Sequence, residues 1–167
     1  MGYQSHRDSA PKSVSCAVLT ISDTRTELDD ETGELIQQKL SQNGHQVISY
    51  SILKNEADSI DKKVRELLGH DELQVIIISG GTGVSHRDIT VETISPILEK
   101  KLDGFGELFR FLTYQEIGTA SIMSRAIAGV ARGKVILCLP GSPGAANLAM
   151  DKIILPEIGH LVREAVR

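Results

Sequence analysis

The sequence predicts an α/β fold, a three-layer α/β/α sandwich around a mostly parallel central sheet. Short apolar runs rich in Val, Ile and Leu alternate with longer segments in which apolar residues recur every three or four positions. This alternation is typical of βαβ units, whose helices cover both faces of a parallel sheet. Hydrophobic residues make up 41% of the 167 residues and aromatic residues only 4%, so we expect one aliphatic domain.

Four of the apolar runs are predicted as buried strands, at residues 14–21, 47–53, 75–78 and 134–139. The third run, Val75-Ile76-Ile77-Ile78, contains no polar residue, which indicates a central strand buried on both faces. Parallel strands end at the same edge of a sheet, and ligands of such folds bind there. Functional residues are therefore expected in the loops that follow these strands.

Six segments are predicted as helices: residues 30–43, 57–68, a short helix from Ile89 that is interrupted near Pro96, 105–116, 145–154 and 157–166. The apolar pattern of residues 122–130 allows either an extended or a helical conformation. Residues 1–13 are polar and are predicted to be a flexible N-terminal arm. Residues 14–167 are expected to form a single domain.

Composition argues against nucleic-acid and membrane partners. The net charge is −4, and there is no basic stripe with interleaved aromatic residues. No apolar run approaches the ~20 residues of a membrane span, and no signal-peptide pattern is present, so a cytoplasmic protein is expected. Cys16 and Cys138 lie in apolar runs, which favours buried side chains over reactive thiols. The five histidines lack metal-ligand spacing.

The strongest local motif is Ser79-Gly80-Gly81-Thr82-Gly83, directly after the predicted central strand. A tight strand-to-helix turn would explain some of these glycines. So many glycines favour a second interpretation, in which exposed backbone N–H groups hold an anion. The motif is neither a P-loop, because no Lys follows Gly83, nor a dinucleotide loop, because His86 stands where Gly is required.

Arg87 and Asp88 close the same loop. Arg87 could pair with an anion through its two parallel donors. Asp88 could cap the helix that starts at Ile89, or it could be a functional carboxylate. A carboxylate beside a bound phosphate repels it unless a divalent cation lies between them, so the second interpretation implies Mg²⁺ or a proton-transfer role.

Three further loops carry polar residues at the expected edge. Ser22-Asp23-Thr24-Arg25 follows the first strand, and the acidic residues 29–31 after it are best explained by helix capping and solvation. Lys54-Asn55-Glu56 follows the second strand, and Pro140-Gly141-Ser142-Pro143-Gly144 follows the fourth. Contact with a ligand is favoured for the last loop, because its Gly permits close approach and its Ser offers a hydroxyl and an N–H.

These pieces together resemble the MoaB/MogA family of molybdenum cofactor biosynthesis proteins. The resemblance runs from about Val14 to the C-terminus. It rests on Ile21-Ser22-Asp23, Ser79-Gly80-Gly81-Thr82-Gly83 with Arg87-Asp88-Ile89-Thr90, Gly104-Phe105-Gly106-Glu107, Ser124-Arg125 and Leu139-Pro140-Gly141-Ser142-Pro143.

The resemblance implies a protein that binds molybdopterin, a pterin dithiolene with a phosphate, and adenylylates it with ATP and Mg²⁺. It implies assembly as a homotrimer or homohexamer, and other molybdenum cofactor biosynthesis proteins as partners. Asp88 matches the family's catalytic carboxylate and would hold the Mg²⁺. The substrate-binding residues implied are Ser22, Asp23, Gly80, Gly81, Thr82, Gly83, Arg87, Glu107, Ser124, Arg125, Pro140, Gly141 and Ser142.

One position departs from the family pattern. Adenylylating members carry Asp after the second strand, whereas this chain has Asn55. Asn brings no charge to a metal, and the adjacent Glu56 is the carboxylate that could replace the missing Asp. Two functions follow from the resemblance: an adenylyltransferase that uses Asp88 and Glu56, and a non-catalytic molybdopterin-binding scaffold that delivers the pterin to a partner.

Overall fold

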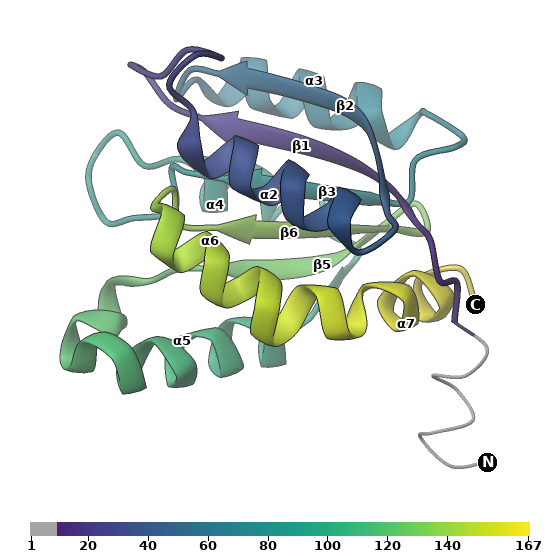
Figure 1. Cartoon of the computed structure of the whole chain (residues 1–167). Coiled ribbons are helices and arrows are strands. Elements are labelled where there is room, and N and C mark those ends of the chain that lie inside the picture. The colour runs from purple at the N-terminus through teal and green to yellow at the C-terminus, as the bar shows by residue number, and fades with distance from the viewer. Residues whose placement is uncertain (1–9) are drawn as a thin grey trace.

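The computed structural model describes residues 10–167, which form one sheet with helices on both faces (Figure 1). The six strands have the order β2-β1-β3-β6-β5-β4. β1 (Ser15–Ile21), β2 (Gln46–Leu53), β3 (Val75–Ser79) and β6 (Lys134–Leu139) are parallel, and β5 (Ile127–Ala131) and β4 (Lys100–Lys101) add antiparallel strands at one edge. The predicted mostly parallel sheet is confirmed. Residues 1–9 of the predicted arm lie outside the described residues.

The helices form the two outer layers of the sandwich, as predicted. α3 (Ala57–Leu68) and α4 (Thr90–Ile94) cover one face of the sheet. The other face is covered by α2 (Glu31–Gln42), α5 (Asp103–Ile117), α6 (Pro143–Ala149) and α7 (Leu155–Ala165), and Figure 1 shows α2, α6 and α7 in front of the strands. Within the described residues, no helix is long and apolar enough to cross a membrane.

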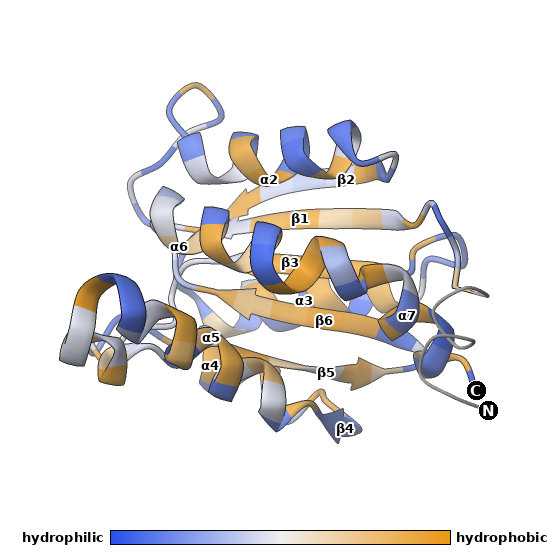
Figure 2. Ribbon diagram, turned by 60° about the horizontal axis from the view of Figure 1, so that its bottom comes forward, coloured by the Kyte–Doolittle hydropathy of each residue, from blue (hydrophilic) through white to orange (hydrophobic). Residues whose placement is uncertain are grey.

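The central strands are buried on both faces because each supplies side chains to two cores. In β1, Val18 packs toward α2 and α6, whereas Leu19 packs toward α3. The central strands β3 and β6 are accordingly coloured as hydrophobic over most of their length (Figure 2). Cys16 and Cys138 are completely buried, and this burial raises the pKa of both thiols, that of Cys16 to about 12. Both thiols therefore stay protonated at neutral pH.

The C-terminal third differs from the prediction in one place, and it shows the conformation of residues 122–130, which the sequence left open. Residues 143–165 form one continuous helical rod, in which the π-helical turn Met150–Ile154 joins α6 to α7, so the predicted break before residue 157 is absent. Pro156 stands in the first turn of α7, where the wider π turn tolerates its missing N–H. Residues 118–123 form a 3₁₀ helix, and β5 follows at Ile127.

The strand order reverses at β1, and a ligand cleft is expected where the order of a parallel sheet reverses. The chain leaves β1 through α2 to β2 on one side, then returns through α3 to β3 on the other side. Thr20 pairs with Ser79, and Ser79 pairs with Leu139, so β1, β3 and β6 end level with one another. In doubly wound sheets, ligands bind where the strand order reverses in this way.

Candidate functional site

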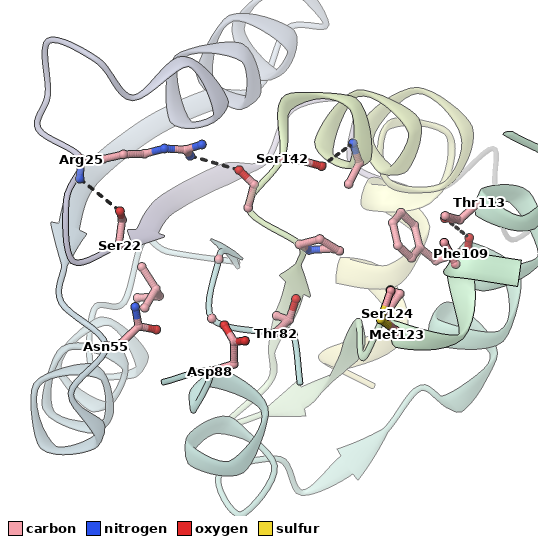
Figure 3. Close-up of a pocket in the computed structure, with 18 of the residues that line it drawn as sticks. Ser22, Arg25, Asn55, Thr82, Asp88, Phe109, Thr113, Met123, Ser124 and Ser142 are labelled. Atoms are coloured by element: carbon pink, nitrogen blue, oxygen red, sulfur yellow. Dashed lines mark hydrogen bonds between the residues drawn. The ribbon is translucent and has the colours of Figure 1, made fainter. Parts of the chain in front are cut away.

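A cavity of about 780 Å³ lies at this carboxyl edge of the sheet (Figure 3). The loops after β1, β2, β3 and β6 all contribute to it, which confirms that the four loops meet. Its polar side is formed by Ser22, Asp23, Thr24, Arg25, Asn55, Gly80, Gly81, Thr82, Gly83, Asp88, Pro140, Gly141 and Ser142. Its opposite side is formed by α5 and the 3₁₀ helix, through Phe109, Thr113, Ile117, Ala120, Ser121, Met123 and Ser124.

Gly80 and Gly81 turn the chain sharply into this cavity. Both adopt the left-handed region, with φ of 97° and 65°. A Cβ on Gly80 would lie 2.2 Å from the carbonyl oxygen of Ile21, so the backbones of the two loops approach more closely than any side chain permits. A Cβ on Gly141 would lie 3.1 Å from the Cα of Gly80, so the loop after β6 also packs closely against this turn. Part of the glycine content is therefore explained by close packing of three loops.

The same turn leaves backbone donors without partners. Gly80 N–H donates to the carbonyl of Leu139 at 2.9 Å. Five other backbone N–H groups donate to no acceptor among residues 10–167. Three lie in the same turn, at Gly81, Thr82 and Gly83, and two lie in the loop after β6, at Gly141 and Ser142. Backbone N–H groups gathered in a concave loop are a common anion-binding arrangement. The cavity therefore has the donors that a phosphate requires.

Arg125 holds the other side of the glycine turn. Its Nε donates to the carbonyl oxygens of Thr82 at 3.3 Å and Gly83 at 2.9 Å, and its guanidinium also pairs with Glu92. This ion pair lowers the pKa of the Glu92 carboxyl. Arg125 does not line the large cavity, so in this structure it supports the loop by binding its carbonyl groups.

Asp88 lies beside the glycine turn and lines the cavity (Figure 3). Its Oδ2 accepts a hydrogen bond from the N–H of Ser85 at 2.9 Å and lies against Gly83. It does not cap a helix, because α4 begins at Thr90 and its N-cap residue, Ile89, makes no side-chain capping bond. Of the two interpretations of Asp88, the helix cap is wrong.

Asn55 reaches the cavity from the loop after β2. Its Oδ1 is buried without a hydrogen-bond partner among the described residues and lies close to Gly81. Its backbone N–H donates to Asp23 at 3.0 Å. Asp23 is also bound by Arg87 at 2.7 Å, and these bonds hold the pKa of the Asp23 carboxyl below its usual range.

Several predicted residues lie outside the large cavity. Arg87 is exposed and pairs with Asp23. Glu56 stands at the start of α3, where it accepts a hydrogen bond from Ser59. Glu107 lines a second hollow of about 490 Å³, together with Arg125 and with Ser124, which lines the large cavity as well. Their assigned roles in substrate binding or catalysis stay predictions.

The side of the cavity formed by α5 and the 3₁₀ helix, called the apolar wall below, is part of the site but is not indicated by the sequence motifs. The same is true of the role of Arg25. Phe109 is buried in the core, stacks on Phe105 at 6.4 Å between ring centroids, and also reaches the cavity. The sequence indicates apolar residues on this helix but not that the helix closes the site. Arg25 belongs to the first of the four loops expected at the site, and its side chain lines the cavity, although no binding role was predicted for it.

The fold and the cavity define a class: doubly wound α/β proteins with a cavity of small-molecule size at the carboxyl edge of the sheet. Residues 17–160 match the family model described as "Probable molybdopterin binding domain". The chain belongs to this molybdenum cofactor biosynthesis family, which confirms the resemblance seen in the sequence motifs.

Relatives and solved structures agree with this membership. The chain is 49% identical to molybdenum cofactor biosynthesis protein B of Halalkalibacterium halodurans over 168 residues, covering 100% of this chain and 99% of the relative. A crystal structure of a molybdenum cofactor biosynthesis protein B superposes with a TM-score of 0.90 at 46% identity, covering 93% of this chain and 98% of that one. The tungsten cofactor synthesizing protein MoaB from Pyrococcus furiosus follows at a TM-score of 0.86 and 35% identity, with coverage of 95% and 100%.

Proposed function

We propose that this chain acts in molybdenum cofactor biosynthesis, where it binds molybdopterin and adenylylates the phosphate of that pterin with Mg-ATP. The observation that carries the proposal is the set of unpartnered N–H groups beside Asp88, opposite an apolar wall. A pterin with a phosphate tail needs both an apolar surface and anion donors. The cavity volume of about 780 Å³ is within the roughly 300–1,000 Å³ of small-molecule sites.

In the proposed reaction, an oxygen of the pterin phosphate attacks the α-phosphorus of ATP. The bond from that phosphorus to the bridging oxygen breaks, and pyrophosphate leaves. The attacking phosphate monoester has a second pKa of about 6, so it is largely deprotonated at neutral pH and requires no general base. The site must then position two anions and neutralise their charge, which backbone N–H groups and a cation can do.

Asp88 and Asn55 are the residues that would hold Mg²⁺. Each places a side-chain oxygen against the glycine turn, Asp88 Oδ2 beside Gly83 and the unpartnered Asn55 Oδ1 beside Gly81. Mg²⁺ prefers oxygen ligands and is usually bound by one or two carboxylates together with substrate phosphates and water. These residues fit such a site, in which the cation would neutralise charge on the phosphate groups.

A second candidate is a non-catalytic carrier that binds molybdopterin and passes it to a partner enzyme. The residue that favours it is Asn55, because its uncharged amide stands where adenylylating members of the family carry Asp. Incubation with molybdopterin, ATP and Mg²⁺, followed by mass spectrometry, separates the two functions. Adenylylated molybdopterin and pyrophosphate support the enzyme, whereas tight pterin binding without product supports the carrier.

Asn55→Asp is expected to reduce the free Mg²⁺ concentration needed for half-maximal turnover, by roughly threefold to tenfold. A second carboxylate beside Asp88 adds charge to the proposed cation site. The rate of product formation as a function of free Mg²⁺ checks this prediction. Asn55→Ala, which removes the Oδ1 atom, is the matched control and should shift the requirement upward. If both variants follow the wild-type curve, residue 55 does not contact the cation.

We also propose that copies of this chain assemble into a homotrimer or homohexamer. Large apolar side chains are exposed along α5 and the 3₁₀ helix after it, namely Leu108, Phe111, Ile117, Ile122 and Met123. Exposed apolar clusters of this kind are typical of contact surfaces between proteins. Light scattering after size exclusion should give three or six times the 18.1 kDa chain mass, and a monomer would contradict the proposal.

A further inference from the structure

Arg25 is the one Lys, Arg or His among the described residues that line the large cavity. The two carboxylates of the cavity, Asp23 and Asp88, would repel a phosphate. Arg87, which the sequence predicted to bind an anion, pairs with the Asp23 carboxylate and is exposed. A phosphorylated ligand would therefore meet a single side-chain cation in this site.

The fold holds the guanidinium of Arg25 through only one of its three nitrogens, Nη1. Nη1 donates to Gly141 O at 3.1 Å, to Thr32 Oγ1 at 3.2 Å and to Asp30 Oδ1 at 3.4 Å. Figure 3 shows the side chain reaching from the loop after β1 to the loop after β6, where the bond to Gly141 is made. The guanidinium is thereby fixed between two of the loops that form the cavity.

The anchor of Arg25 is itself rigid. The Asp30 side chain is completely buried, and it also accepts hydrogen bonds from Tyr50 at 2.7 Å and from the N–H of Gly33 at 3.0 Å. Thr32 donates to the same Gly141 carbonyl at 2.8 Å. These bonds restrict the Asp30 side chain to few conformations, and the Asp30 carboxylate in turn helps to fix the Arg25 guanidinium.

The opposite edge of the guanidinium is left for a ligand. Nε and Nη2 make no hydrogen bond with residues 10–167, and 30% of the side chain is exposed. These two nitrogens present parallel N–H groups, an arrangement that matches two oxygens of one phosphate. A side chain that is anchored at one end and open at the other loses little conformational entropy when it binds.

We propose that Arg25 binds a phosphate group of the ligand through Nε and Nη2, while Nη1 stays bonded to the protein. This inference rests on the proposed function and names the side chain that gives the site its selectivity for phosphorylated ligands. Two phosphates could occupy the position, the monoester of molybdopterin or the triphosphate of ATP. Binding measurements with each ligand separate these two sources.

The test compares Arg25→Lys with Thr32→Val. Lys keeps a cation opposite buried Asp30, which protects the fold, but it cannot present two parallel N–H groups. Thr32→Val removes the Thr32 hydrogen bond to Gly141 and one of the three acceptors of Arg25 Nη1, but it keeps the guanidinium and its bonds to Gly141 and Asp30. The affinities of wild type and both variants are measured by calorimetry, without oxygen, for molybdopterin, for molybdopterin treated with phosphatase, and for a non-hydrolysable ATP analogue.

We expect Arg25→Lys to weaken binding of one phosphorylated ligand by roughly tenfold to hundredfold. Its affinity for dephosphorylated molybdopterin should stay within about twofold of wild type. The ligand that loses affinity identifies which phosphate Arg25 holds. Thr32→Val should weaken binding of molybdopterin and its dephosphorylated form by the same factor.

Two results would overturn the inference without touching the proposed function. One is a loss for Arg25→Lys that is equal with and without the phosphate, because Arg25 would then act only by positioning the Gly141 loop. The other is wild-type affinity of Arg25→Lys for both phosphorylated ligands. A wild-type protein that binds neither form of molybdopterin would instead remove the proposed function, and this inference with it.

Discussion

Asp88→Asn is expected to lower the rate of adenylyl transfer by on the order of a hundredfold or more, with molybdopterin affinity nearly unchanged. The substitution removes the negative charge proposed to hold Mg²⁺ but keeps an oxygen that can accept the hydrogen bond from Ser85 N–H. Single-turnover formation of adenylylated molybdopterin measures the rate, and calorimetry measures the affinity.

Glu56→Gln provides a matched comparison, because it removes a carboxylate that lies outside the cavity. It should leave turnover close to wild type. The sequence alone offered Glu56 as a replacement for the missing carboxylate at residue 55, and a large loss in this variant would restore that role. Unchanged turnover in Asp88→Asn would remove Asp88 from catalysis.

Gly80→Ala is expected to reduce the free energy of unfolding by about 3 kcal/mol. Gly80 has a φ of 97°, and an added Cβ would lie 2.2 Å from the Ile21 carbonyl, which belongs to the rigid end of β1. Neither atom can move without separating the loops after β1 and β3. Chemical denaturation of wild type and variant gives the difference.

Gly104→Ala is the control for the loss of a glycine as such. Gly104 lies in the first turn of α5 without a positive φ, and an added Cβ there would meet no other atom within 4 Å. Because Ala favours the helix over Gly, this variant should be more stable by roughly 0.5 kcal/mol. If Gly80→Ala unfolds at the wild-type denaturant concentration, the loops are not packed as described.

The sequence predicted the sheet well because its central strands are unambiguous. A run such as residues 75–78 can be stable only when it is buried on both faces, and α3 was predicted with its bounds at Ala57 and Leu68. β4 was missed because it consists of two exposed lysines that carry no hydrophobic pattern. The predicted break between residues 154 and 157 is absent, because the π turn Met150–Ile154, whose Met150, Ile153 and Ile154 are buried in the core, joins the two helices.

The sequence indicated a sharp turn at the glycines, which Gly80 and Gly81 adopt with positive φ, but it indicated no contact between distant segments. Three glycines after a buried strand indicate an anion loop from local sequence alone. Nothing local shows that Arg25 reaches Gly141, which lies 116 residues away in the chain, or that α5 supplies the apolar wall. The same holds for Arg125. Its place in a sequence motif does not reveal that it binds the carbonyl of Gly83 from outside the large cavity.

The central claim is that backbone N–H groups at the carboxyl edge of the sheet hold the phosphate of the ligand. Amide chemical shifts in a ¹H–¹⁵N NMR titration with molybdopterin test it most directly, with the phosphatase-treated pterin as reference. We predict saturable downfield shifts at Gly81, Thr82, Gly83, Gly141 and Ser142 that require the phosphate. The account would be contradicted if the signals of these five amides did not move and the shifted signals instead belonged to residues around Glu107 and Arg110, in the second hollow.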